Sequence, residues 1–181
     1  VGRELTNRYP ERHCEIGDTI FEIKDWNVYH SDDSQRLVIK DVSLHVRKGE
    51  VVGLAGLMGA GRTETTRAIF GIDPKESGQF FLDGKEIMIR RPEDAIRAGI
   101  VLAPEDRKKD GLCTKLSIRH NIALPNLDLL CSRMGVVSRT KEDEMCNKVV
   151  ADLKVKTPNV DVNAGNLSGG NQQKVVVGKW L

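Results

Sequence analysis

The stretch GLMGAGRTE, Gly56–Glu64, differs by one residue from the phosphate-binding P-loop pattern G-x-x-x-x-G-K-[ST]. Gly56 and Gly61 have the required spacing and Thr63 closes the pattern, but Arg62 stands where the pattern has lysine. Glycines let the backbone approach a phosphate closely, and a helix that begins near Arg62 turns the positive end of its dipole toward the anion. The Thr63 hydroxyl suits Mg²⁺, whereas the planar guanidinium of Arg62 supplies charge without being interchangeable with an ammonium. The residues predicted to bind nucleotide phosphates are Gly56, Leu57, Met58, Gly59, Ala60, Gly61, Arg62, Thr63 and Glu64.

The segments on either side of this stretch have the pattern that a P-loop requires. EVVGLAG, residues 50–56, is a continuous apolar run typical of a buried parallel strand. RTETTRAIFG, residues 62–71, reads as a helix with a glycine stop. This context favours a phosphate loop over the alternative, a glycine-rich turn from strand to helix that binds no ligand.

The remaining elements are predicted from their periodicity and their turn residues. Alternating apolar and polar residues predict two antiparallel strands at 19–30 and 37–50, and Asp83-Gly84 predicts a hairpin turn. RPEDAIRAG (91–99), with proline near its start, predicts a short helix, GIVLAP (99–104) predicts a second buried strand, and 105–112 predicts a charged loop. Two further helices are expected over 117–124 and 140–155, and residues 167–181 are expected to begin with a serine-glycine loop and continue into a third helix.

Length and composition limit the classes of protein to consider. The 181 residues suffice for one domain with its own core, and a net charge of +2 is too small to indicate nucleic acid as a partner. No apolar run approaches the roughly 20 residues that cross a bilayer. The cysteines and histidines lack metal-ligand spacing, and the cysteines are expected to be free thiols in a reducing compartment. These residues are Cys14, Cys113, Cys131, Cys146, His13, His30, His45 and His120.

A second motif, LSGGNQQK, occupies Leu167–Lys174. Taken alone, it fits a capped helix start, because Ser168 is a good N-cap residue and the two glycines form a loop. Its position about one hundred residues after a P-loop favours a functional interpretation.

Together the two motifs resemble the nucleotide-binding domain of an ABC transporter, whose signature loop is typically LSGGQ. The form LSGGNQQK with GLMGAGRTE is similar to the second ABC module in the ATPase subunit of bacterial importers for ribose, galactose and xylose. VGREL…YP resembles the linker between the two modules, and PEDRKKDGL resembles the loop after the third core strand, so the resemblance covers essentially the whole chain.

The resemblance implies an α/β fold of the P-loop NTPase, ABC type, with an antiparallel β subdomain and a helical subdomain. It assigns 1–17 to the linker, 18–181 to an incomplete ABC domain that ends before the Walker B strand, and about 113–170 to the helical subdomain. Without the Walker B strand, the D-loop and the switch histidine, the fragment alone is expected to be inactive as an ATPase.

The resemblance also implies ATP and Mg²⁺ as cofactors and gives roles to residues outside the P-loop. Glu105 stands where most ABC domains have the Q-loop glutamine, so Thr63 and Glu105 are the residues expected near Mg²⁺. Tyr29 or His30 is near the position that stacks on adenine, although each could instead be a strand residue that packs on the core. The residues expected at the signature loop are Ser168, Gly169, Gly170, Asn171 and Gln172.

The implied partners are the first ABC module of the same polypeptide, transmembrane permease subunits and, indirectly, a periplasmic sugar-binding protein. The implied location is the cytoplasmic face of the bacterial inner membrane, as a peripheral protein, with no role for nucleic acid. In the implied mechanism, the signature of this chain completes the ATP site of the partner module, while the Arg62 loop binds nucleotide with little hydrolysis. Three alternatives stay open: the same architecture with autoinducer-like or nucleoside cargo, a structural or regulatory module that does not use its own nucleotide, and an ABC ATPase of DNA repair or translation.

Overall fold

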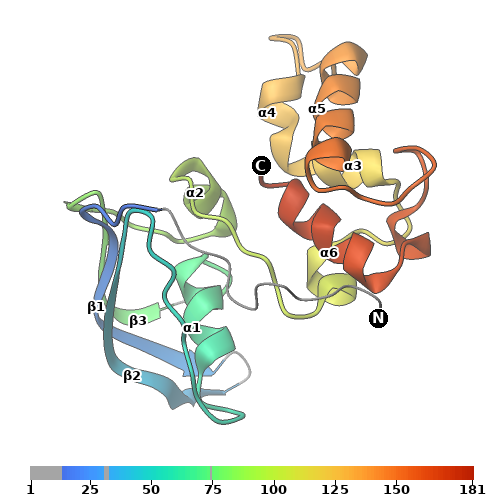
Figure 1. Cartoon of the computed structure of the whole chain (residues 1–181). Helices are drawn as coiled ribbons and strands as arrows, with labels where there is room; N and C mark the ends of the chain where they lie inside the picture. Colours follow the sequence, from blue (N-terminus) through green and yellow to red (C-terminus); the bar gives the residue numbers. More distant parts are fainter. Residues whose placement is uncertain (1–13, 31–32, 74) are drawn as a thin grey trace. The chain divides into compact units, whose positions relative to one another are not determined.

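The chain forms two compact units. The computed structural model describes residues 14–30, 33–73 and 75–181. One unit ends at Leu102 and the other is Ala103–Leu181; in Figure 1 the first runs from blue to green and the second from yellow-green to red. The predicted domain limits at 17/18, 113 and 170 stay predictions, and residues 1–13 of the predicted linker lie outside the described residues.

The first unit contains a four-stranded antiparallel sheet in the order β2-β1-β3-β4. The strands are β1 (Thr19–His30), β2 (Asp33–Arg47), β3 (Lys75–Leu82) and β4 (Lys85–Glu86). The predicted antiparallel pair and the predicted hairpin are therefore confirmed. The hairpin turn is made by Asp83 and Gly84 with φ of 49° and 73°, the left-handed conformation that a two-residue type I′ turn requires.

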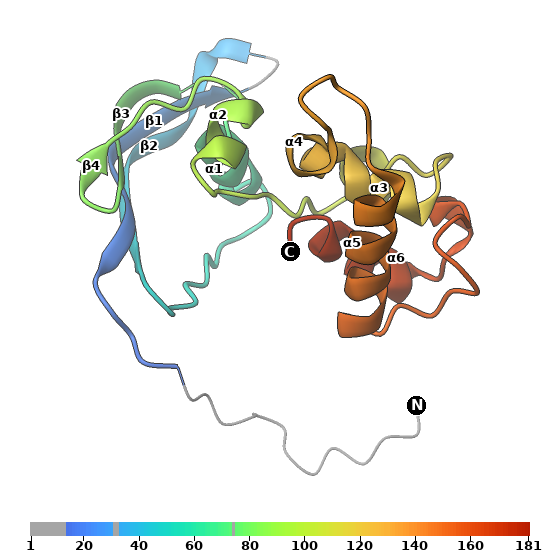
Figure 2. The same cartoon turned by 90° about the horizontal axis from the view of Figure 1, so that it is seen from above.

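A bulge in β1 decides which of its side chains are buried. The pairing register is irregular between Ile23 and Trp26, and Asp25 has φ of 50°. One extra residue shifts the alternation, so Ile23, Trp26 and Val28 all become buried. The Trp26 ring packs on Phe80 of β3 with centroids 5.9 Å apart. Helix α1 (Arg62–Ile69) contacts β1 and β2 (Figures 1 and 2), and α2 (Pro92–Arg97) begins at its proline as predicted.

The two predicted buried parallel strands are wrong for this structure. Residues 50–56 and 99–104 lie outside every strand, and Val51, Leu54 and Val101 are exposed. A parallel strand of continuous apolar residues is buried only when neighbouring strands pair with it. Among the described residues the only pairings between strands are antiparallel, and they involve β1 to β4.

The second unit is helical. Its helices are α3 (Ile118–Ala123), α4 (Leu127–Leu130), α5 (Arg139–Asp152) and α6 (Gly169–Gly178), and its single turns are η1 (Arg107–Gly111), η2 (Leu124–Asn126) and η3 (Ala164–Asn166). The prediction of a charged loop over 105–112 is wrong at η1, where the chain forms a π-helical turn. Asp106 stabilises that turn because its carboxylate accepts hydrogen bonds from the backbone N–H groups of Lys108 and Lys109.

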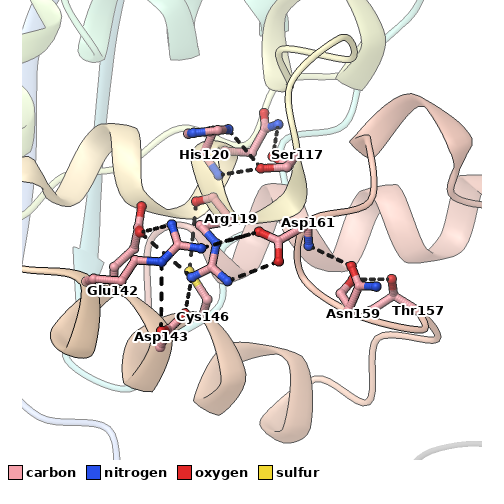
Figure 3. A network of polar contacts seen from close by, with 11 residues as sticks. Ser117, Arg119, His120, Glu142, Asp143, Cys146, Thr157, Asn159 and Asp161 are labelled. Carbon is pink, nitrogen blue, oxygen red and sulfur yellow. Dashed lines mark hydrogen bonds and ion pairs between the residues drawn. The ribbon is translucent and has the colours of Figure 1, made fainter.

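A buried arginine organises the polar side of this unit (Figure 3). The side chain of Arg119 on α3 is 5% exposed and donates to both carboxylate oxygens of Asp161, at 2.7 and 3.3 Å. It also donates to Asp143 on α5 and lies 3.7 Å from the Glu142 carboxylate. Arg119 therefore joins α3 to α5 and to the segment that precedes η3.

Among the described residues, no helix is long and apolar enough to cross a bilayer.

Candidate functional site: a phosphate loop and a signature loop

The predicted phosphate loop is an open turn at the start of α1. Gly59 and Gly61 both have φ of 79°, a conformation that side chains rarely adopt. A Cβ on Gly61 would also lie 2.3 Å from Cδ1 of Ile39, so both conformation and packing require glycine there. Thr65 fixes the end of the loop, because its backbone N–H and its hydroxyl both donate to the Gly61 carbonyl, at 2.8 and 2.7 Å. The turn before it is closed by the Ala60 N–H, which donates to the Leu57 carbonyl at 3.1 Å.

Arg62 and Thr63 are exposed at the first turn of α1, where they face solvent with the loop. The Arg62 side chain folds back over the loop, since its Cδ and Nε lie 3.8 and 3.9 Å from the position of a Cβ on Gly56. The geometry combines glycine backbone, a guanidinium over it and a helix N-terminus, which fits the phosphates of a nucleotide. Leu57 and Met58, at 85% and 99% exposure, form the apex.

The two residues proposed for adenine lie at the end of β1. Tyr29 pairs with Leu37 and His30 pairs with Asp33, and both rings are half-buried. They share the first unit with the phosphate loop. Packing on the sheet and stacking on a base are both compatible with this position, so the adenine role stays a prediction.

Glu105, the predicted Q-loop position, is exposed in the second unit. It lines a pocket with Pro104, Arg107, Gln173 and Val176, between the segment leading to η1 and one face of α6. Backbone N–H groups of the following turn lower the pKa of the neighbouring Asp106 carboxyl, so that residue is a turn cap. Mg²⁺ contact by Glu105 stays a prediction.

The signature loop opens α6, with Ser168 at the N-cap position. Its hydroxyl does not cap the helix; instead it accepts a hydrogen bond from Nδ2 of Asn171 at 3.0 Å. Oδ1 of Asn171 in turn accepts the backbone N–H of Lys156 at 3.0 Å, which connects the loop to the segment that follows α5. Ser168 and Gly170 are exposed, so a ligand can reach them from outside.

Gln172, predicted beside the signature, is only 1% exposed. Its Nε2 donates to the carbonyls of Ala164 and Gly165 at 3.2 and 3.4 Å, and its Oε1 accepts from Nε of Arg107 at 3.2 Å. In this structure the side-chain amide of Gln172 stabilises the signature loop from its buried side. A contact of Gln172 with nucleotide stays a prediction. Arg107 is the site residue that the sequence analysis missed: it stands in the quoted run PEDRKKDGL, but no spacing signal links it to a glutamine 65 positions later.

Comparison with known proteins identifies the family of the chain. The ABC transporter family profile matches residues 39–181, so the chain belongs to the ABC transporter family. Over its whole length the chain is 46% identical to the xylose import ATP-binding protein XylG of Thermoanaerobacter pseudethanolicus, of which it covers 36%. It is 45% identical to the ribose import ATP-binding protein RbsA of Bacillus subtilis, of which it covers 35%. The chain thus spans about a third of the length of these relatives.

Solved structures give the same fold. An ATP-binding cassette of an ABC transporter in its ADP conformation superposes with a TM-score of 0.67 at 22% identity, covering 90% of this chain and 64% of that one. A dimeric ATP-binding cassette bound to ADP and Pi gives 0.69 at 19% identity, covering 90% and 69%. At these identities the likeness concerns the fold alone, and that fold is the α/β P-loop NTPase fold of ABC type, as predicted.

Proposed function

We propose that this chain is the second of two ATP-binding modules in an ATPase subunit that drives import of a monosaccharide. The observation that carries the proposal is its 46% and 45% identity, over the whole chain, to import ATP-binding proteins for xylose and ribose that are about three times its length. The arginine-bearing phosphate loop and the LSGGN signature support the same assignment.

In this proposal the Arg62 loop binds ATP but contributes little to hydrolysis. The glycine turn and the N-terminus of α1 hold the phosphates, and Arg62, already folded over Gly56, contacts their outer oxygens. The Thr63 hydroxyl would hold Mg²⁺, and the ion would neutralise phosphate charge there. Because a guanidinium fork replaces the compact ammonium of the usual motif, the loop holds the nucleotide in a different geometry, and the site braces the closed state.

The signature loop of this chain completes the ATP site of the first module. The Ser168 hydroxyl accepts from Asn171, which leaves its own O–H to donate to a γ-phosphate oxygen. The exposed backbone of Gly170 and the N-terminal end of α6 add further positive potential for the same anion. ATP-driven closure is then passed to transmembrane permease subunits through the surface around Glu105, at the cytoplasmic side of the membrane, and a periplasmic sugar-binding protein supplies the cargo.

Calorimetry of Mg-ATP binding to the chain tests the role of Arg62. Saturable binding is expected, with weaker binding in Thr63→Ala and unchanged binding in the control Arg97→Lys, an exposed arginine on α2 of the same unit. If the native chain does not bind Mg-ATP and Arg62→Lys does, the module contributes only its signature loop to an ATP site. That result would favour the alternative of a structural or regulatory module that does not use its own nucleotide. Binding that neither Arg62→Lys nor Thr63→Ala alters would refute the proposed phosphate ligands.

The cargo is tested in the two-module protein with its permease and binding protein in vesicles. ATP-dependent uptake of labelled xylose, ribose or galactose is expected. Uptake of a nucleoside or an autoinducer-like compound with none of the three sugars would favour the alternative cargo class within the same architecture.

A further inference from the structure

One arginine lies beneath the first turn of the signature helix. Nε of Arg107 donates to Oε1 of the buried Gln172 at 3.2 Å. Nη2 of the same guanidinium lies 2.8 Å from the position of a Cβ on Gly169, so a side chain at 169 would displace the end of the arginine. The guanidinium therefore contacts α6 at its first residue and one turn later.

The turn that carries Arg107 contacts α6 along its length. Gly111, the last residue of η1, lies against Val176, with only 3.1 Å between a Cβ placed there and Cγ2. Nζ of Lys179, just after α6, donates to the Gly111 carbonyl at 2.7 Å. Burial lowers the pKa of this lysine, as expected for an ammonium taken out of water. Residues 107–111 and α6 thus form one packed body held at its start, its middle and its end.

We propose that Arg107 is a positioning residue for the signature loop: it fixes the first turn of α6, and with it Ser168 and Gly170, relative to the segment that bears Glu105. The inference rests on the proposed function, in which this loop completes an ATP site. Since Glu105 is two residues before Arg107, any movement of this segment reaches the signature through the bond to Gln172. The charge also adds to the positive potential at the helix N-terminus, which favours an anion there.

The test compares variants of the two-module protein by steady-state ATPase kinetics and by hydrogen exchange. Arg107→Ala is expected to lower kcat about tenfold with KM for ATP changed less than about twofold, because misplacing a catalytic group costs rate more than binding. Arg107→Lys should restore part of the rate, since an ammonium can still donate to Gln172. The matched control is Lys109→Ala, which removes an exposed cation from the same turn and should leave both readouts unchanged.

Exchange of the backbone amide of Gln172 measures how well the first turn of α6 is fixed, because this N–H donates to the Ser168 carbonyl at 2.9 Å. Arg107→Ala should accelerate exchange of this amide about tenfold while exchange in α5 stays as in the parent. Parent-like exchange at Gln172, or faster exchange across the whole unit, would overturn the inference.

Ser168→Ala distinguishes the two proposals. If it abolishes turnover while Arg107→Ala behaves as the parent, the proposed function stands and the role of Arg107 is wrong. If Ser168→Ala retains full turnover, the signature does not complete an ATP site, and the inference is overturned together with the proposed function.

Discussion

Removal of the Arg119 charge is expected to destabilise the helical unit. In Arg119→Met the apolar stem stays while the bonds to Asp161, Asp143 and Glu142 are lost. Breaking a buried ion pair from one side costs about 3–5 kcal/mol. Here two of the three carboxylates, Asp143 and Asp161, are 43% and 60% exposed and stay hydrated, and Glu142 keeps Arg139 at 3.0 Å. We therefore expect a loss of about 2–3 kcal/mol in the free energy of unfolding of this unit.

Native-state hydrogen exchange of α3 and α5 amides measures this loss within the helical unit alone. The expected change is exchange about 30- to 150-fold faster, since each 1.4 kcal/mol is a factor of ten. Arg133→Met is the control, because it makes the same substitution at an exposed position of the same unit. Exchange in Arg119→Met within about threefold of the parent would refute the view that this network joins α3 to α5.

Three further outcomes follow from single residues. Gly61→Ala should lower the stability of the first unit by about 1–3 kcal/mol and abolish ATP binding, because φ is 79° and the new Cβ meets Ile39; an unchanged melting temperature by circular dichroism would contradict this. Burial raises the pKa of the Cys146 thiol to about 11, so iodoacetamide at neutral pH should label the exposed Cys113 and reach Cys146 only after urea; rapid labelling of native Cys146 would show the site to be open. The guanidinium bonded to Asp161 lowers the pKa of that carboxyl. The stability that this ion pair gives the folded unit is therefore complete above the pKa of about 3.9 in the unfolded chain, and it is lost as pH falls through the lower pKa of the folded chain. The gap in urea midpoint between the parent and Asp161→Asn should therefore close below about pH 4, and a gap that persists in acid would contradict the assignment.

Elements set by local chemistry could be predicted from the sequence. The Asp83-Gly84 turn and the proline at the start of α2 each act within a few residues of the element they define. Ser117, which the sequence analysis placed inside the helix over 117–124, instead caps α3, where its hydroxyl accepts the backbone N–H of His120 at 3.2 Å. The phosphate loop belongs to the same class, since Gly61 lies directly at the N-cap of α1.

Features that depend on distant partners could not be predicted. The apolar runs 50–56 and 99–104 have the composition of buried strands, but a strand also needs a neighbour to pair with, and composition does not supply one. The bulge at Asp25 broke the simple alternation in β1. Arg119 and Asp161 are 42 residues apart in the sequence, and no periodic pattern predicts that they pair.

The two motifs contain glycine for different physical reasons, and the difference bears on function. Gly61 is required by its own conformation and packing, whereas a Cβ on Gly169 would meet only the flexible end of the Arg107 side chain, at 2.8 Å. Gly170 has no positive φ, and a Cβ there would meet nothing within 4 Å. Alanine would favour the helix at that position by up to about 1 kcal/mol. In the proposed function, close approach of a phosphate to the exposed start of α6 would require a glycine at 170.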